Sequence, residues 1–332
     1  MRKILWNASA LALVGILALG GAMAWFACSP LNLSTSPLEF SIKRGSGLRS
    51  ATGQMIDAGI GLWSQPFELM GRLTSNQANI KAGSYEVSAG ITPWYLMQKI
   101  TQGEFAQSEI VFIEGWTFRQ VRAALDSHPS VRHDTSGLRD AEVMRHVSAD
   151  GMPPEGMFFP DTYLFGKGES DLAILARAYR TMQKQLQSAW QQRRPDLPIS
   201  TPYEALILAS IVEKETGQAS EREIIAGVFT NRLRTGMLLQ TDPTVIYGLG
   251  DKFDGSLRKR DLMKDAPFNT YTRAGLPPHP IGMPGQASLL AAVNPAKTDA
   301  LYFVARGDGT SQFSRSLDEH NRAVAKYQRA GR

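Results

Sequence analysis

Two carboxylates, Glu213 and Glu215, stand at the end of an almost continuously apolar stretch that runs from Tyr203 to Thr216. A stretch of this kind predicts a helix that is buried on all sides, and Gly217 is a natural C-terminal stop. The C-terminal end of a helix carries partial negative charge and favours cations, so acids there break a rule of helix composition. Such departures often mark functional residues, and the chemistry that acids can perform is proton transfer.

Helical spacing places the two acids on different faces. Glu215 shares a face with Leu208 and Ile211, whereas Glu213 shares one with Ser210. A carboxyl beside apolar surface at a helix C-terminus is driven toward its protonated form by desolvation and by the helix dipole. A general acid that protonates a glycosidic oxygen needs that form. The alternative is a structural helix-end acid that pairs with a nearby cation: Lys214, Arg222 or Arg232.

Polar and aromatic side chains gather in two short segments after this helix. They are Gln240, Thr241, Asp242 and Tyr247 in the first segment, and Asn269, Thr270 and Tyr271 in the second. Amides and hydroxyls beside rings suit sugars, whose faces are apolar and whose rims carry hydroxyls. Asn and Thr in loops are more often simple turn residues, so each segment alone is a weak signal.

The elements that must position these residues are predominantly helical. Leu172 to Gln192 has one apolar face at helical spacing. Ser220–Glu223 has the pattern of a capping box and predicts a second helix that ends near Arg234. Pro243 is placed to open a short third helix. Pro153 to Gly168, rich in Gly, Pro and aromatic residues, predicts a loop.

The N-terminal half repeats a different pattern three times: a short extended run, a Gly turn and a helix. The runs begin at Phe40, Gly83 and Ile110, and Thr92 and Thr117 are the predicted caps of the second and third helices. This pattern predicts a small α+β module. LysM modules, which bind N-acetylglucosamine polymers, combine the same elements. A purely structural module without carbohydrate affinity remains the alternative.

An apolar run from Ile4 to Ala27 follows the basic pair Arg2 and Lys3. As a helix it is about 36 Å long, enough to cross a bilayer, and the basic pair predicts a cytoplasmic N-terminus. We expect a retained anchor, with the rest of the chain outside the cytoplasm. A cleaved signal peptide with a site at Ala22–Ala24 is the alternative. Cys28 fits a membrane-edge residue better than a lipid-anchored one.

Composition excludes several classes of protein. The 332 residues are 43% hydrophobic and 20% charged, which is ordinary globular composition. The net charge of +5 suits anionic partners, but the chain lacks the basic blocks and motifs of nucleic-acid binding, so no nucleic-acid partner is expected. A single cysteine excludes an internal disulfide and a cysteine-based zinc site. The five histidines have no metal-ligand spacing, so we expect no metal and no cofactor.

Long motifs from Phe159 onward carry a family resemblance. They are Phe159–Tyr163, Ala209–Thr216, Asn231–Leu233, Leu239–Gly248, Asn269–Tyr271, Gly275–Pro278, Asn294–Ala296 and Leu301–Ala305. With them the chain resembles the endolytic murein transglycosylases of the YceG-like family over nearly its whole length. The match is loose in the linker and around residues 127–147.

The resemblance implies an α+β protein with four parts. These are a cytoplasmic tip and transmembrane anchor over 1–28, a linker over 29–37, a LysM-like module over 38–108, and a larger, mostly helical catalytic domain over 109–332. It implies a single-span inner-membrane enzyme whose catalytic domain lies in the periplasm. The implied partners are peptidoglycan glycan strands and the inner membrane, with peptidoglycan synthases as further candidates.

The resemblance also implies a reaction. Nascent glycan is cleaved between N-acetylmuramic acid and N-acetylglucosamine, a 1,6-anhydro end is left, and glycan elongation is thereby ended. The family's catalytic glutamate maps to Glu215. Gln240, Thr241, Asp242, Tyr247, Asn269, Thr270 and Tyr271 are then candidates for binding sugar or orienting Glu215, and Glu213 for anchoring structure.

Three rivals stay open on the sequence. A hydrolase would pair Glu215 with a second acid, Asp242 or Glu213. A non-catalytic scaffold would bind peptidoglycan through the LysM-like module. A penicillin-binding acyl enzyme would use the S-x-x-K pattern at Ser256–Lys259, but Lys297-Thr298-Asp299 stands where K-T-G is required.

Overall fold

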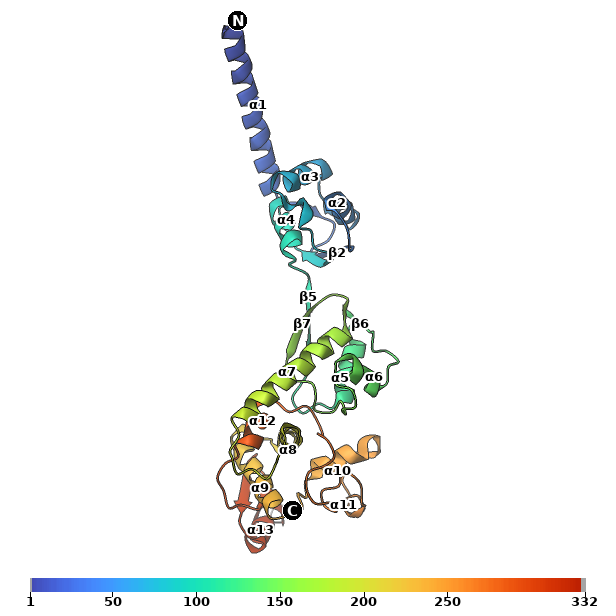
Figure 1. The fold of residues 1–332 in the computed structure, drawn as a ribbon, viewed down its shortest axis with the longest axis vertical. Coiled ribbons are helices and arrows are strands. Elements are labelled where there is room, and N and C mark those ends of the chain that lie inside the picture. The colour runs from blue at the N-terminus through green and yellow to red at the C-terminus, as the bar shows by residue number, and fades with distance from the viewer. Residues whose placement is uncertain (1, 330–332) are drawn as a thin grey trace. The chain divides into compact units, whose positions relative to one another are not determined.

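The computed structural model describes residues 2–329, and for residues 2–12, 77, 328 and 329 it describes the backbone alone. The chain is a mixed α and β protein that forms two compact units (Figure 1). Unit 1 comprises residues 1–108 together with 164–169, and unit 2 comprises 109–163 together with 170 onward. All sheets in the described part are two-stranded.

Unit 1 is built on one antiparallel strand pair. Strand β2 (Leu38–Ile42) pairs with β4 (Gly83–Val87), and Phe40 lies opposite Tyr85. Helices α2 (Leu48–Asp57) and α3 (Ser64–Leu73) connect the strands, and α4 (Pro93–Gln102) follows them. Alternate residues of β2 are buried, as expected for a strand with one face on a core. Burial also raises the pKa of Tyr85 to about 12.

Helix α1 (Arg2–Cys28) precedes these elements, and Phe26 near its end packs into the core of unit 1. The predicted anchor begins in residues 1–12, whose side chains lie outside the described part. None of the helices in the described part is long and apolar enough to cross a membrane. The segment predicted as a linker, 29–37, is part of unit 1, because β1 (Asn32–Leu33) within it pairs with β3 (Ile60–Gly61).

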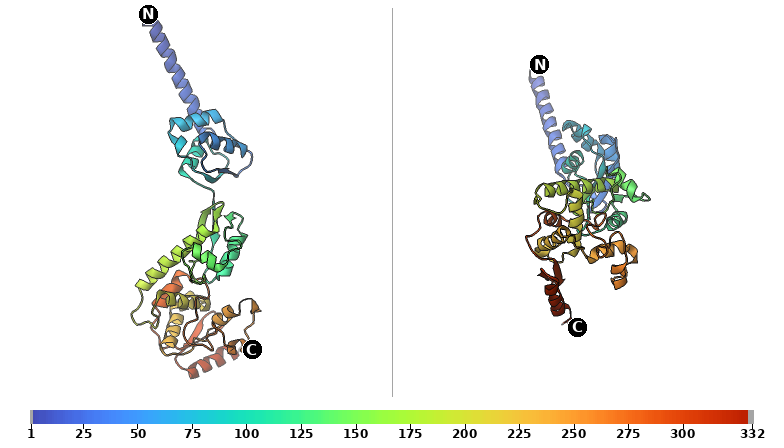
Figure 2. Two further views of the ribbon diagram at one scale, coloured as in Figure 1. Left: turned by 45° about the vertical axis from the view of Figure 1, so that its right-hand side comes forward. Right: turned by 60° about the horizontal axis from the view of Figure 1, so that its bottom comes forward.

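Unit 2 surrounds the buried helix α8 (Pro202–Glu215), which packs against α7 (Asp171–Gln191), α9 (Arg222–Arg234), α10 (Asp242–Leu249) and α12 (Gln286–Val293) (Figure 2). All residues from Ala205 to Val212 are buried, which confirms the predicted core helix. The other helices are α5 (Phe118–Ser127), α6 (Asp140–His146), α11 (Lys259–Met263) and α13 (Leu317–Val324).

The strands of unit 2 lie at its margins. Hairpin strands β9 (Tyr302–Ala305) and β10 (Ser311–Ser314) are antiparallel. The short strand β6 (Val131–Arg132) pairs with β8 (Glu169–Ser170). Strands β5 (Gln107–Val111) and β7 (Thr162–Gly166) also pair, and each contains residues of both units.

Most predicted helix boundaries are confirmed. The side chain of Thr92 caps α4, and Thr117 begins α5 with a capping box. The predicted capping box at Ser220–Glu223 is wrong. A 3₁₀ turn leads into α9, no side chain caps it, and the Glu221 carboxylate instead accepts the Ser311 N–H at 2.7 Å. The N-cap residue of α9, Glu221, therefore uses its side chain in a tertiary contact.

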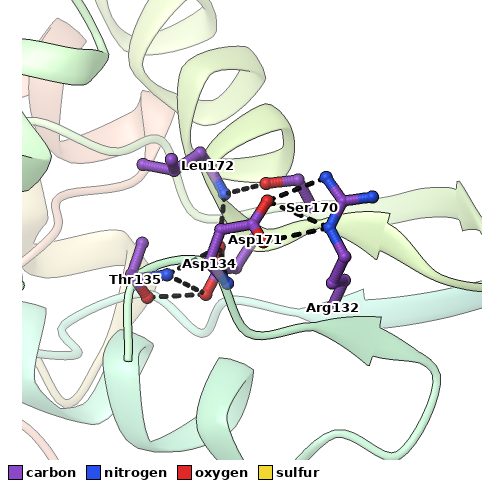
Figure 3. Close-up of polar contacts among 6 residues, drawn as sticks. All are labelled: Arg132, Asp134, Thr135, Ser170, Asp171 and Leu172. Carbon is purple, nitrogen blue, oxygen red and sulfur yellow. Dashed lines mark hydrogen bonds and ion pairs between the residues drawn. The ribbon is translucent and has the colours of Figure 1, made fainter. Parts of the chain in front are cut away.

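The start of α7 is tied to the β6 turn by a buried acid (Figure 3). Asp171 is 0% exposed, and its carboxylate accepts the Thr135 hydroxyl at 2.6 Å, the Thr135 N–H at 3.0 Å and the Leu172 N–H at 2.7 Å. Carboxylates are favoured in the first turn of a helix. Asp171 therefore fixes the N-terminus of α7 within unit 2.

Candidate active site

The last turn of α8 positions Glu215 at the edge of the buried core of unit 2. Its side chain is half-buried, and the Thr241 hydroxyl donates a hydrogen bond to Oε1. Burial raises the pKa of Glu215 above its ordinary value of 4.5, and the nearby Asp242 charge raises it further. The Thr241 hydrogen bond and the Arg232 charge act in the opposite direction. The net rise favours a carboxyl that holds its proton.

The turn before α10 places Thr241 against Glu215. Gln240 has a positive φ of 47°, a conformation that residues other than Gly rarely adopt, and its N–H donates to the Thr270 carbonyl at 3.0 Å. The Thr241 N–H donates to Thr270 Oγ1 at 3.1 Å, and the hydroxyls of Thr244 and Thr270 are 2.9 Å apart. This buried network holds the backbone of Thr241 in place. The Thr241 hydroxyl donates to Glu215 and does not cap α10.

Asp242 and Tyr271 form the outer part of the site. The Tyr271 hydroxyl donates to Asp242 Oδ1 at 2.5 Å, and the Asp242 side chain is exposed. Asn269, by contrast, is buried, and its amide donates to three carbonyls, those of Asp261, Leu262 and Lys264. Its Oδ1 accepts the Tyr271 N–H at 2.9 Å. Asn269 therefore supports the Tyr271 loop, and its amide is not available to a ligand.

Arg232 supplies a buried cation near Glu215. Its Nε donates to the Leu301 carbonyl and its Nη1 to the Leu239 carbonyl, each at 2.6 Å. The guanidinium also lies 5.4 Å from the centre of the Tyr302 ring. The sequence offered Arg232 only as one of three partners for a helix-end acid. The Leu301 carbonyl that helps to hold it lies 69 residues away in the sequence and gives no local signal.

Glu213 faces away from this group. Its side chain is 8% exposed, its Oε2 accepts the Gly285 N–H at 2.9 Å, and Arg222 lies 3.8 Å from its Oε1. Burial, together with the Glu213 charge, raises the pKa of the neighbouring Glu114. Glu213 thus ties the end of α8 to the turn before α12.

Glu155 is a buried acid that the sequence patterns did not single out. It is 5% exposed, its Oε1 accepts the Phe118 N–H at 3.0 Å, and its Oε2 accepts the Tyr247 hydroxyl at 3.1 Å. Burial raises the pKa of Glu155 to about 7. The ring of Tyr247 contacts those of Phe268 and His279 edge to face. The one available signal was an acid within the ring-rich Pro153–Gly168 segment.

A cleft of about 910 Å³ lies between α5 and α10 in unit 2, and we call it the α5–α10 cleft. Glu155 and Tyr247 line it, and so do Lys214 and Pro243, which directly precede Glu215 and follow Asp242 in the chain. The cleft therefore adjoins the elements that carry the two acids of the site.

One cluster of described side chains has the geometry to share a cation: Asp126, His133 and Asp171. Asp171, however, already uses both carboxylate oxygens as acceptors of N–H and O–H donors. A carboxylate satisfied in this way anchors a helix start, and the cluster carries no argument for a metal centre.

A partly buried carboxyl with a raised pKa that accepts a hydroxyl hydrogen bond has the properties of a candidate acid–base group. The motifs around it match known proteins. A family model described as YceG-like matches residues 40–326. The chain belongs to the YceG-like family.

Similar proteins extend this result. A Bacillus subtilis protein named endolytic murein transglycosylase is 34% identical over 269 residues, which are 75% of this chain and 74% of that protein. A Streptococcus pneumoniae protein of the same name is 25% identical over 286 residues, which are 76% of this chain and 51% of that protein, so this chain matches about half the length of the pneumococcal relative. A crystal structure of a YceG-like protein from Listeria monocytogenes is 28% identical, covers 87% of this chain and 99% of its own, and superposes with a TM-score of 0.54.

Proposed function

We propose that this protein is an endolytic lytic transglycosylase of peptidoglycan and that Glu215 is its catalytic acid and base. The names of its relatives support the activity. The observation that carries the assignment of Glu215 is a carboxyl at the end of α8 whose pKa is raised by burial and whose Oε1 accepts the Thr241 hydroxyl.

The proposed reaction uses one carboxyl twice. Protonated Glu215 donates its proton to the oxygen that links C1 of N-acetylmuramic acid to N-acetylglucosamine, and the C1–O bond breaks. Positive charge develops at C1 and its ring oxygen. The C6 hydroxyl of the same sugar then bonds to C1 and returns its proton to Glu215. The products are a 1,6-anhydro end and a free hydroxyl, and no water is consumed.

Neighbouring groups fit this cycle. Thr241 orients the Glu215 carboxyl and stabilises it when it is ionised, as does the Arg232 cation. The Asp242 charge favours the protonated form at the start, and the same negative charge would stabilise the positive C1 centre. Tyr271 holds Asp242 through its hydroxyl.

A hydrolase that uses Asp242 as a second carboxylate is the alternative, because Asp242 lies close enough for its charge to act on Glu215. Glu213 is a poorer second acid, since Gly285 and Arg222 occupy its oxygens. The mass of the product separates the two reactions, because an anhydro end is one water lighter than a reducing end.

The test of Glu215 is Glu215→Gln. Glutamine keeps the shape of the side chain but cannot cycle a proton, so turnover of uncrosslinked glycan should fall by about 10²–10⁴-fold or more, with glycan binding retained. Glu213→Gln is the matched control on the same helix turn and should lose far less. An active Glu215→Gln protein beside an inactive Glu213→Gln protein would show that the two roles are reversed.

Two further parts of the proposal concern the N-terminal region. We propose that residues 4–27 anchor the protein in the inner membrane, with the catalytic unit in the periplasm. The apolar run and the basic pair before it support this placement. A reporter fused after Arg332 should be active only outside the cytoplasm, and a cytoplasmic signal would contradict the placement.

Unit 1 is proposed as a LysM-like module that binds glycan. Its compact α+β core supports an independent module. Deleting residues 38–108 should weaken binding to glycan, and unchanged affinity would favour a purely structural role.

A further inference from the structure

The α5–α10 cleft is a built cavity that the acid–base cycle does not use. Its volume of about 910 Å³ lies within the range of ~300–1,000 Å³ typical of ligand pockets. The Glu155 carboxylate joins the first N–H of α5 to the Tyr247 hydroxyl of α10, so the two helices on either side of the cleft are linked.

The charged groups of the cleft are largely neutralised. Arg119 pairs with Asp251, and Arg122 pairs with Asp140 at 2.9 Å and also donates to two carbonyls. Such paired groups favour a neutral polar ligand over an anion. The Lys214 ammonium at the rim donates to the Gly115 carbonyl at 3.3 Å.

Groups that can bind a sugar remain on the walls. Phe253 is half-buried, and its ring contacts no other aromatic ring in the described part of the chain. Gln120 uses its amide oxygen in the cap of α5, and its amide nitrogen has no acceptor among the described residues. A ring and an amide donor on the walls of one cleft match the apolar face and hydroxylated rim of a pyranose.

We propose that the α5–α10 cleft is a subsite that binds sugar units of the glycan strand next to the bond that Glu215 cleaves, with Phe253 as its stacking surface. The inference rests on the proposed function for the identity of the strand. The evidence for the position of the subsite is independent of that function. Lys214 and Pro243 line the cleft, and they are the sequence neighbours of Glu215 and Asp242.

The experiment measures binding of uncrosslinked tetrasaccharide and octasaccharide glycan fragments to the full chain by calorimetry. Glu215→Gln serves as the parent protein, so that the fragments stay intact. Adding Phe253→Ala should weaken the binding of both fragments, and octasaccharide binding should fall about tenfold, which corresponds to about 1.4 kcal/mol. Phe253→Tyr, which keeps the ring, should restore the parent affinity.

The matched control is Trp190→Ala, which removes a half-buried ring on α7 that does not line the cleft. If Phe253→Ala lowers the melting temperature substantially, Phe253→Leu carries the test, because Leu fills the volume without a ring face. Equal octasaccharide affinities for the parent and the Phe253 variant, or an equal loss in Trp190→Ala, would overturn the subsite. Cleavage of the fragments by Glu215→Gln would instead overturn the proposed function.

Discussion

Replacing Glu155 by Gln should change how the stability of the protein depends on pH. Glu155 is 5% exposed, and burial raises its pKa from 4.5 to about 7. An acid whose pKa is higher in the folded than in the unfolded state holds its proton more tightly when folded. Its stabilising contribution is complete below the unfolded pKa and is lost as the pH rises through about 7.

The magnitude follows from the size of the rise. One pKa unit corresponds to about 1.4 kcal/mol, so a rise from 4.5 to about 7 corresponds to about 3 kcal/mol. Gln resembles the protonated acid at every pH. It can accept the Phe118 N–H through its oxygen and donate to the Tyr247 hydroxyl through its nitrogen. The stability of Glu155→Gln relative to the parent should therefore increase by up to about 3 kcal/mol between pH 4.5 and pH 8.

Urea unfolding at a series of pH values measures this difference. Tyr247→Phe is the companion variant, because it removes a hydroxyl whose hydrogen bond lowers the pKa of Glu155. When Tyr247→Phe is compared with the Tyr247→Phe, Glu155→Gln double variant, their difference in stability should develop at a higher pH than in the parent protein. A difference between Glu155→Gln and the parent that stays constant from pH 4.5 to pH 8 would refute the reasoning.

Three further changes test the site. Thr241→Val removes the hydrogen bond that lowers the pKa of Glu215. The alkaline limb of the pH profile of kcat/KM should therefore move to higher pH, and kcat should fall. An alkaline limb at the same pH as in the parent would contradict this. Gly285→Ala would place a Cβ 1.8 Å from Glu114 Oε1, but Glu114 is exposed and its side chain can rotate away. The free energy of unfolding in urea should therefore change by no more than about 0.5 kcal/mol, and a much larger loss would contradict this. Arg232→Met leaves the Leu239 and Leu301 carbonyls without their donor. The free energy of unfolding should fall by about 3 kcal/mol or more, and activity should be lost. A fully active, stable variant would show that this cation is dispensable.

Local patterns in the sequence determined the framework of the site. The apolar run before Gly217 predicted α8, and Pro243 predicted the start of α10, because helix burial and helix ends depend on residues within a few positions of one another. The same spacing separated Glu215 from Glu213. The structure places the two acids with different partners, Thr241 for Glu215 and Gly285 for Glu213.

Tertiary structure alone decided which groups surround these acids. The Glu213 carboxylate accepts an N–H 72 residues away, and the carboxylate of Glu221, the N-cap residue of α9, accepts one 90 residues away. Glu155 gained its raised pKa only because the fold buries it between α5 and α10. Desolvation and long-range hydrogen bonds depend on which segments pack together, and the local spacing of residue types does not specify that packing.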